Sequence, residues 1–159
     1  MKPLMLATDG SPTADKATQT AINLARLVDT ELVIVSVWDI PYTTVGLAPM
    51  PVTGAFATVG QDEAQKVVAE AAARAEEAGV EARTIVRRGL PVDEICVAAE
   101  KFDAQFLVLG SHGWGALKRA IFGSVSTGVL HHARCPVLVV PAEQLDGKMR
   151  EPARQEIPA

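Results

Sequence analysis

The chain has 159 residues, of which 48% are hydrophobic, 21% are charged and 4% are aromatic. This length is typical of a single domain with one core, and the composition excludes a disordered chain, a fibrous repeat and a coiled coil. The formal net charge of -4 disfavours generic nucleic-acid binding, because neutralising phosphates requires a basic face. We expect neither a signal peptide nor a transmembrane helix, since no apolar run approaches roughly 18 residues. Cys96 and Cys135 show no CxxC spacing, which favours structural, reduced thiols in the cytoplasm.

The first elements are a strand, a turn, a helix and a second strand. An apolar pattern over Pro3 to Thr8 predicts the first strand and ends at the turn formed by residues 9–12. Ser11 is a favourable N-cap and Pro12 suits the first helical position, so a helix should follow. The stretch from Glu31 to Trp38 is nearly continuous and β-branched. It indicates a strand that is covered on both faces, as in a parallel sheet.

The segment from Asp39 to Gly60 shows neither a helical nor an alternating pattern, and it is interrupted by prolines and glycines. We expect a long loop here. Loops longer than about 12 to 15 residues in a compact domain often act as lids or binding segments. A variable insertion without a functional role is the alternative, and the sequence leaves both open.

The second half of the chain alternates helices and strands. Gln61 to Ala78 is rich in alanine and precedes Gly79, which is placed for a left-handed C-cap. The elements expected next are a strand over Val80 to Val86, a helix over Pro91 to Lys101, a strand over Gln105 to Leu109, a helix over Ser124 to Ala133 and a strand over Pro136 to Pro141. Residues 142–159 lack periodicity, so we expect a mobile tail.

Five strands separated by four helices predict an α/β fold with an open parallel sheet, right-handed crossovers and helices on both faces. In such sheets, ligands bind at the carboxyl ends of the strands, where the strand order reverses. The functional residues should therefore be sought just after the strands.

A glycine-rich stretch after the fourth strand carries the clearest chemical signal. Gly110 and Gly113 follow the strand, and Gly123 and Ser124 begin the next helix, which gives the pattern G-x2-G-x9-G-[ST]. Glycines allow a close approach of the backbone to an anion, and the N–H groups and dipole at a helix N-terminus favour phosphate. Ser124 and Ser126 can add hydroxyl donors. The stretch therefore predicts a phosphate-binding loop.

Asp9, at the end of the first strand, should lie at the same edge of the sheet. One carboxylate facing an anion-binding loop suits a ribose hydroxyl or a metal ion bound to phosphates. The loop itself contains no acidic residue between Gly110 and Ser124, while Lys118 and Arg119 are basic. The P-loop pattern and a GxGxxG after the first strand are both absent, which disfavours P-loop kinases and ordinary dinucleotide dehydrogenases.

Simpler interpretations remain open for several of these residues. Gly110 and Gly113 alone could be turn formers, and Asp9 could serve only an Asx-turn or a helix cap. His112 has no carboxylate partner in the sequence and is more typical of a loop hydrogen bond than of a general base. The adjacent histidines 131 and 132 suit a helix C-terminus at the surface better than a metal site.

Taken together, the motifs resemble the universal stress protein family over about residues 1 to 141. The motifs that carry the resemblance are Ala7-Thr8-Asp9-Gly10-Ser11, Val37-Trp38-Asp39, Gly89-Leu90-Pro91, Gly110-Ser111-His112-Gly113 and Cys135 to Val140. The resemblance implies one domain over residues 1–141 and a Rossmann-like fold, similar to that of the adenine nucleotide alpha hydrolases, with strand order 3-2-1-4-5. It also places the glycine pattern in the subgroup that binds ATP.

The resemblance further implies the residues of a nucleotide site. The residues implied at the nucleoside are Ala7, Thr8, Asp9, Val37, Leu109 and Gly110. The residues implied at the phosphates are Gly113, Gly123, Ser124, Val125 and Ser126. Family members that resemble this sequence form homodimers through the last strand, here Val137 to Val140. An edge strand would otherwise remain an exposed template for pairing, which gives such a dimer a physical reason.

We therefore expect a cytoplasmic, dimeric protein that binds ATP or a related adenine nucleotide, with Mg²⁺ or Mn²⁺ carried by the phosphates. The sequence shows no identifiable base, nucleophile or transition-state arginine, which favours a nucleotide-dependent stress-response regulator acting on a protein partner over a turnover enzyme. The alternatives are a slow metal-dependent ATPase and a nucleotide-free interaction module.

Overall fold

The computed structural model describes residues 1–39, 42–45, 48–51, 55–112 and 122–141. Its central feature is a five-stranded parallel sheet. The strands, in spatial order, are β5 (Ala82–Arg88), β2 (Leu32–Trp38), β1 (Leu4–Ala7), β6 (Phe106–Gly110) and β7 (Val137–Val140). Counted along the chain without the separate β3–β4 hairpin, this order is 3-2-1-4-5. The expected fold class and strand order are confirmed.

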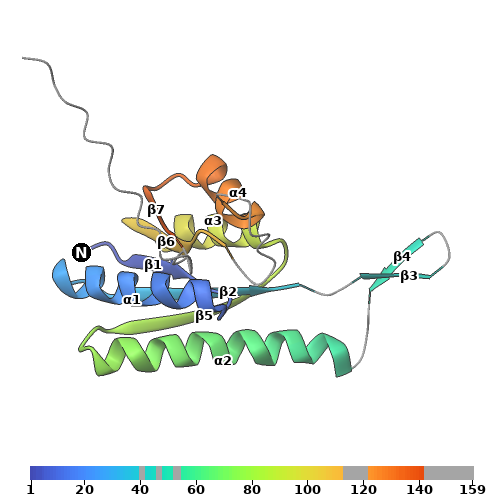
Figure 1. Ribbon diagram of the computed structural model, residues 1–159, viewed down its shortest axis with the longest axis horizontal. Coiled ribbons are helices and arrows are strands. Elements are labelled where there is room, and N and C mark those ends of the chain that lie inside the picture. The colour runs from blue at the N-terminus through green and yellow to red at the C-terminus, as the bar shows by residue number, and fades with distance from the viewer. Residues whose placement is uncertain (40–41, 46–47, 52–54, 113–121, 142–159) are drawn as a thin grey trace, which may run out of the picture.

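Helices cover both faces of this sheet (Figure 1). α1 (Pro12–Leu27) and α2 (Ala55–Glu77) pack on one face, while α3 (Pro91–Lys101) and α4 (Ser124–His132) pack on the other. Side chains along β1 point alternately to the two faces of the sheet. Leu4 and Leu6 pack in the core beneath α1 and α2, whereas Met5 and Ala7 pack in the core beneath α3 and α4. All four residues are buried. Of the helices in the described ranges, none combines the length and the apolar character needed to cross a membrane.

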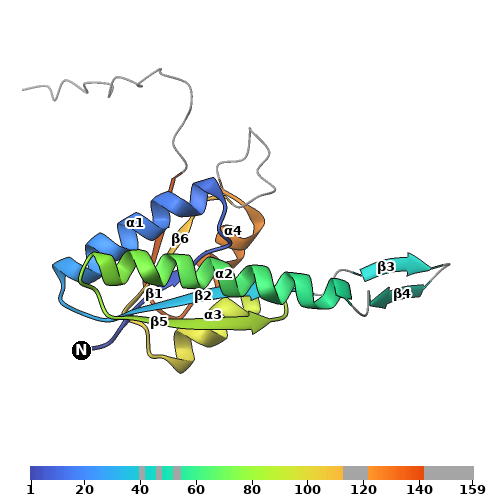
Figure 2. The same ribbon diagram turned by 90° about the horizontal axis from the view of Figure 1, so that it is seen from below.

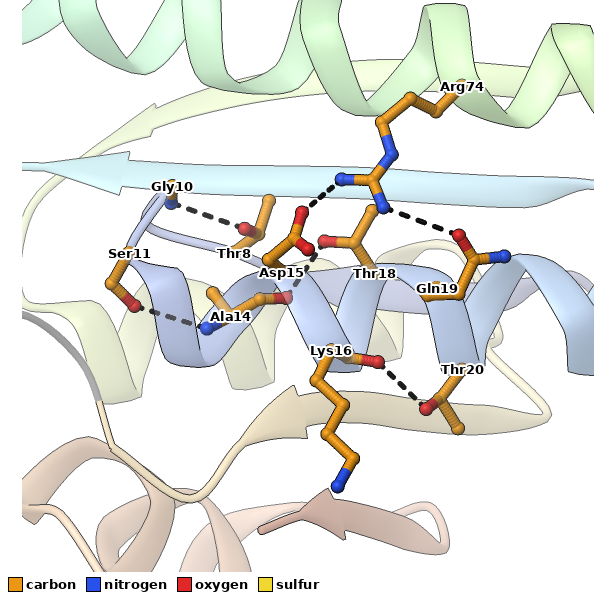
Figure 3. Close-up of polar contacts among 10 residues, drawn as sticks. All are labelled: Thr8, Gly10, Ser11, Ala14, Asp15, Lys16, Thr18, Gln19, Thr20 and Arg74. Atoms are coloured by element: carbon orange, nitrogen blue, oxygen red, sulfur yellow. Dashed lines mark hydrogen bonds and ion pairs between the residues drawn. The ribbon is translucent and has the colours of Figure 1, made fainter. Parts of the chain in front are cut away.

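The start of α1 follows the sequence prediction. Ser11 has an extended backbone and its side chain accepts a hydrogen bond from the Ala14 N–H at 3.2 Å, with Pro12 at the first helical position. Arg74 of α2 contacts both Asp15 and Gln19 of α1 (Figure 3). These contacts join the two helices that cover one face of the sheet.

The prediction of a structureless loop from Asp39 to Gly60 is wrong. The described part of this segment contains the antiparallel hairpin β3 (Tyr42–Val45) and β4 (Ala48–Pro51), and α2 begins at Ala55 rather than at Gln61. The hairpin stands beyond the amino-terminal end of α2, away from the main sheet (Figures 1 and 2). Among the described strands, β3 and β4 pair only with each other and form a sheet separate from the main one.

Gly60 led the sequence analysis to place the start of α2 at Gln61, although the helix begins at Ala55. A single glycine costs a helix only about 1 kcal/mol, and the surrounding helix absorbs that cost. At the other end, the predicted cap at Gly79 is confirmed: its φ is +76°, its N–H donates to Glu76 O at 2.9 Å, and the N–H of Val80 donates to Ala75 O at 2.9 Å. Val80 therefore belongs to the C-terminal cap of α2, and β5 starts only at Ala82.

The predicted tail over residues 142–159 lies outside the described residues. The remaining elements differ from the expected boundaries by only one or two residues, and α3 has the predicted bounds.

Alanine substitutions at Gly79 and Gly60 test the assigned ends of α2, because they should change the free energy of unfolding in opposite directions. Gly79→Ala should lower the free energy of unfolding by about 1 to 2 kcal/mol, because alanine is strained in the left-handed region. Gly60→Ala should raise it by up to about 1 kcal/mol, because a Cβ there meets Trp38 at an ordinary 3.4 Å and alanine favours the helix. Urea titration followed by circular dichroism measures both changes. A stabilising Gly79→Ala or a clearly destabilising Gly60→Ala would contradict the assigned ends of α2.

Candidate functional site

The candidate site is a cavity of about 420 Å³ at the carboxyl ends of β1 and β6. These strands are neighbours and parallel, but the chain leaves β1 toward α1 on one face of the sheet and leaves β6 toward α4 on the other. The two connections therefore diverge and open a crevice between them, as is typical of the point where strand order reverses.

The predicted nucleotide residues come together around this cavity. Those that line it are Ala7, Thr8, Asp9, Val37, Leu109, Gly110, Gly123, Ser124, Val125 and Ser126. Gly113, the remaining predicted site residue, lies outside the described residues, as do Lys118 and Arg119. The structure thus joins segments that are more than 100 residues apart in the sequence.

Sequence reasoning missed part of the apolar wall. Val35 lies two positions before Val37 on β2, so both side chains point to the same face of the sheet, and both line the cavity. Pro91 and Ile95 contribute from the first turns of α3, one turn apart. The spacing of Val35 could have been recognised from the period of a strand. The contribution of α3 required knowledge of how that helix packs over β2.

Further lining residues come from α1 and from the segments that flank β6 and α4. They are Ala14, His112 and Phe122. Phe122 directly precedes Gly123 and is exposed. None of these positions is marked by the glycine pattern itself, although His112 and Phe122 lie inside it.

The turn after β1 holds Asp9 at the mouth of the cavity. One carboxylate oxygen of Asp9 accepts a hydrogen bond from the Ser11 N–H at 3.0 Å. The Gly10 N–H donates to the Thr8 hydroxyl at 3.3 Å (Figure 3). Gly10 has a φ of +72°, and a Cβ there would lie 2.6 Å from Val67 of α2. The Asx-turn considered from the sequence is therefore present, and Asp9 lines the cavity at the same time.

The first turn of α4 forms the opposite, polar side. Gly123 is the N-cap of this helix and supplies no side chain to its first N–H groups. Its own N–H donates to Ser111 O at 2.6 Å, and the buried Ser126 hydroxyl lies 2.9 Å from the same carbonyl and 3.0 Å from Gly123 O. The hydroxyl of Ser126 therefore fixes the backbone of the site, while the exposed Ser124 lies at its mouth.

His112 lines the cavity, and its Nδ1 lies 3.0 Å from the Ser111 hydroxyl. His131 and His132 are exposed in the last turn of α4, and His132 Nδ1 lies 2.8 Å from Gly128 O. Within the described residues, no group of three or more histidine, cysteine or acidic side chains is placed to hold a metal ion.

Burial raises the pKa of the thiols of Cys96 and Cys135, which belong to the core between α3, α4 and the sheet. Both cysteines are unbridged. Neither cysteine is among the described residues that line the cavity.

Comparison with known proteins adds sequence relationships to this geometry. The model of the universal stress protein family matches residues 1–141. Universal stress protein MJ0531 of Methanocaldococcus jannaschii is 36% identical over 143 residues, covering 87% of this chain and 81% of the relative. Universal stress protein YxiE of Bacillus subtilis is 34% identical over 143 residues, covering 86% of this chain and 97% of the relative.

Solved structures show the same architecture. A protein from the universal stress protein family of Burkholderia pseudomallei has a TM-score of 0.69 at 29% identity, covering 89% of this chain and 96% of that structure. A universal stress protein from Archaeoglobus fulgidus has a TM-score of 0.71 at 24% identity, with 87% and 98% of the two chains covered.

Proposed function

The chain belongs to the universal stress protein family, and from this premise and the cavity between β1 and β6 we propose that it binds ATP or a related adenine nucleotide. The observation that carries the proposal is the junction of an apolar crevice with the glycine-capped N-terminus of α4. A nucleotide needs both parts, since its base is largely apolar and its phosphates are anionic.

The base and ribose suit the part of the cavity formed by the strands. Val35, Val37 and Leu109 offer apolar contacts to the faces of a purine ring. Asp9 extends beside them and can accept a hydrogen bond from a ribose hydroxyl. We assign the nucleoside to this part, with Ala7, Thr8 and Gly110 completing it.

The phosphates suit the first turn of α4. Backbone N–H groups at a helix N-terminus, aided by the helix dipole, favour an anion, and Gly123 leaves them uncovered by a cap side chain. Ser124, Val125 and Ser126 follow in this turn. We assign Gly113 to the phosphates as well, on the family pattern.

A divalent cation fits this site only if the phosphates of a nucleotide supply part of its ligands. Asp9 is the one carboxylate among the described residues that line the cavity. Mg²⁺ commonly binds through one or two carboxylates together with phosphate oxygens, so Asp9 and a nucleotide would supply such a set. Mg²⁺ or Mn²⁺ would neutralise phosphate charge there.

Proteins that share this fold support an adenine nucleotide as the ligand class. Universal stress proteins have been solved in complex with cyclic AMP and, from Archaeoglobus fulgidus, with dAMP, and a family member from Arabidopsis thaliana has AMP bound. At 18 to 24% identity these likenesses show the shared fold. For this chain, the proposal rests on its family membership and its own cavity.

We propose a regulatory role for the nucleotide. Asp9 and His112 are the titratable side chains among the described lining residues, and the Nδ1 of His112 contacts a serine hydroxyl. This set suits binding better than the activation of a water molecule, which needs a positioned base. The protein would signal its nucleotide state to a protein partner in the stress response, in the cytoplasm.

The edge strand β7 supports a homodimer as the working form. Among the strands that the structure describes, β7 has a neighbour on one side only, and Leu138 is 38% exposed on it. Leu130 of α4 is 46% exposed. Pairing of β7 with the same strand of a second chain would satisfy its free edge and cover apolar surface.

Calorimetric titration of nucleotide-stripped protein tests the nucleotide proposal. We expect saturable binding of ATP in the micromolar to low millimolar range, and at least about a tenfold loss in Val37→Trp, because the larger ring fills the apolar part of the cavity. Val97→Trp is the matched control, since Val97 is exposed on α3 and absent from the lining. If ATP, AMP and cyclic AMP all fail to bind the wild type, the proposal is wrong.

Analytical ultracentrifugation tests the dimer. The wild type should sediment with the mass of two chains, and Leu138→Glu should shift it toward one chain, because a buried unpaired carboxylate at the interface is costly. Leu27→Glu serves as the control, since Leu27 is 81% exposed on α1. A monomeric wild type, or a Leu138→Glu variant that remains a dimer, would rule out assembly through β7.

A further inference from the structure

The Thr13 hydroxyl joins the two sides of the candidate site without lining it. Thr13 lies in the first turn of α1, and its hydroxyl donates to the His112 carbonyl at 2.6 Å. The same oxygen lies 3.0 Å from the Ser11 hydroxyl. Thr13 is not among the residues that surround the cavity. It therefore connects the segment after β1 with the segment after β6 while lying outside the cavity lining.

The direction of each hydrogen bond follows from the available donors. A carbonyl oxygen only accepts, so the single hydroxyl hydrogen of Thr13 goes to His112 O. Ser11 must then donate to Thr13, and its oxygen accepts from the Ala14 N–H at 3.2 Å. The Ser11 N–H donates to Asp9. A continuous chain of hydrogen bonds thus runs from Asp9 through Ser11 and Thr13 to His112.

The main chain after β6 is held from its other side by α4. The Gly123 N–H donates to Ser111 O at 2.6 Å, and Ser126 donates to the same carbonyl. Residues 111–112 therefore lie between α1 and the N-terminus of α4, with one carbonyl bound to each. The contact with α1 is close, because a Cβ at Gly110 would lie 3.3 Å from both Thr13 O and His112 O.

We propose that Thr13 is a positioning residue that sets the affinity of this site for phosphate. By holding His112 against α1, it fixes the separation between Asp9 and the glycine-capped N-terminus of α4. Loss of the hydroxyl releases the His112 carbonyl. The first turn of α4 then moves with the backbone of residues 111–112, because Gly123 and Ser126 are hydrogen-bonded to the Ser111 carbonyl. This inference rests on the proposed nucleotide-binding function and adds the device that tunes it.

Capping of α1 does not account for the Thr13 hydroxyl. Ser11 already provides the side-chain cap of this helix through the Ala14 N–H. The partner of Thr13 is instead 99 residues away in the sequence. A role in positioning therefore predicts a selective effect on phosphate, whereas a role in helix stability predicts a general one.

The test compares ATP with adenosine, which lacks phosphates, in three variants of the full chain. Thr13→Val keeps the shape but removes the hydroxyl, and Thr13→Ser keeps the hydroxyl. Thr20→Val is the matched control, because the Thr20 hydroxyl donates to Lys16 O on the exposed side of the same helix (Figure 3). Calorimetry gives both dissociation constants, and thermal unfolding monitors the stability of each variant.

We expect Thr13→Val to weaken ATP binding by about tenfold while adenosine binding changes by less than about twofold. Thr13→Ser and Thr20→Val should both bind ATP like the wild type. An equal loss for ATP and adenosine, or unchanged ATP binding in Thr13→Val, would overturn the positioning role alone. A wild type that binds neither compound would overturn the proposed function, and the inference with it.

Discussion

The divergence of the chain at β1 and β6 is the constraint on which the rest of the site depends. Two adjacent parallel strands send their connections to opposite faces of the sheet, so neither α1 nor α4 covers the space between their carboxyl ends. The described residues that are proposed to contact a nucleotide all line that opening. The buried strands make it rigid, because Leu6 and Val108, which pair in register, are both inaccessible to solvent.

The polar side of the opening is built largely from backbone groups. Ser111 O receives the N–H of Gly123 and the hydroxyl of Ser126, while His112 O receives the hydroxyl of Thr13. Small hydroxyl side chains thus bind carbonyl groups of this backbone. No side-chain cap covers the first N–H groups of α4, and such groups favour an anion. In the proposed function, phosphate is recognised through this geometry, and its affinity would follow from how firmly the flanking segments are held.

The sequence was sufficient to predict the strands of the main sheet and the start of α4, because both depend on local signals. Continuous β-branched runs mark buried strands, and Gly123 marks a helix start. The hairpin β3–β4 and the early start of α2 escaped prediction, since the hairpin forms a sheet separate from the main one and Gly60 resembles a helix breaker. Pro91 and Ile95 also escaped, because their place in the cavity depends on tertiary packing of α3.

The central claim is that the N-terminus of α4 receives the phosphates of a nucleotide whose base lies against β2 and β6. Amide chemical shifts recorded during an ATP titration of isotope-labelled protein test it most directly. The account predicts the largest shifts at Ser124 and Val125, with little change at Asp103 and Gln105, which lie just before the amino end of β6. Shifts that concentrate at Asp103 and Gln105, with the α4 amides unchanged, would contradict the account.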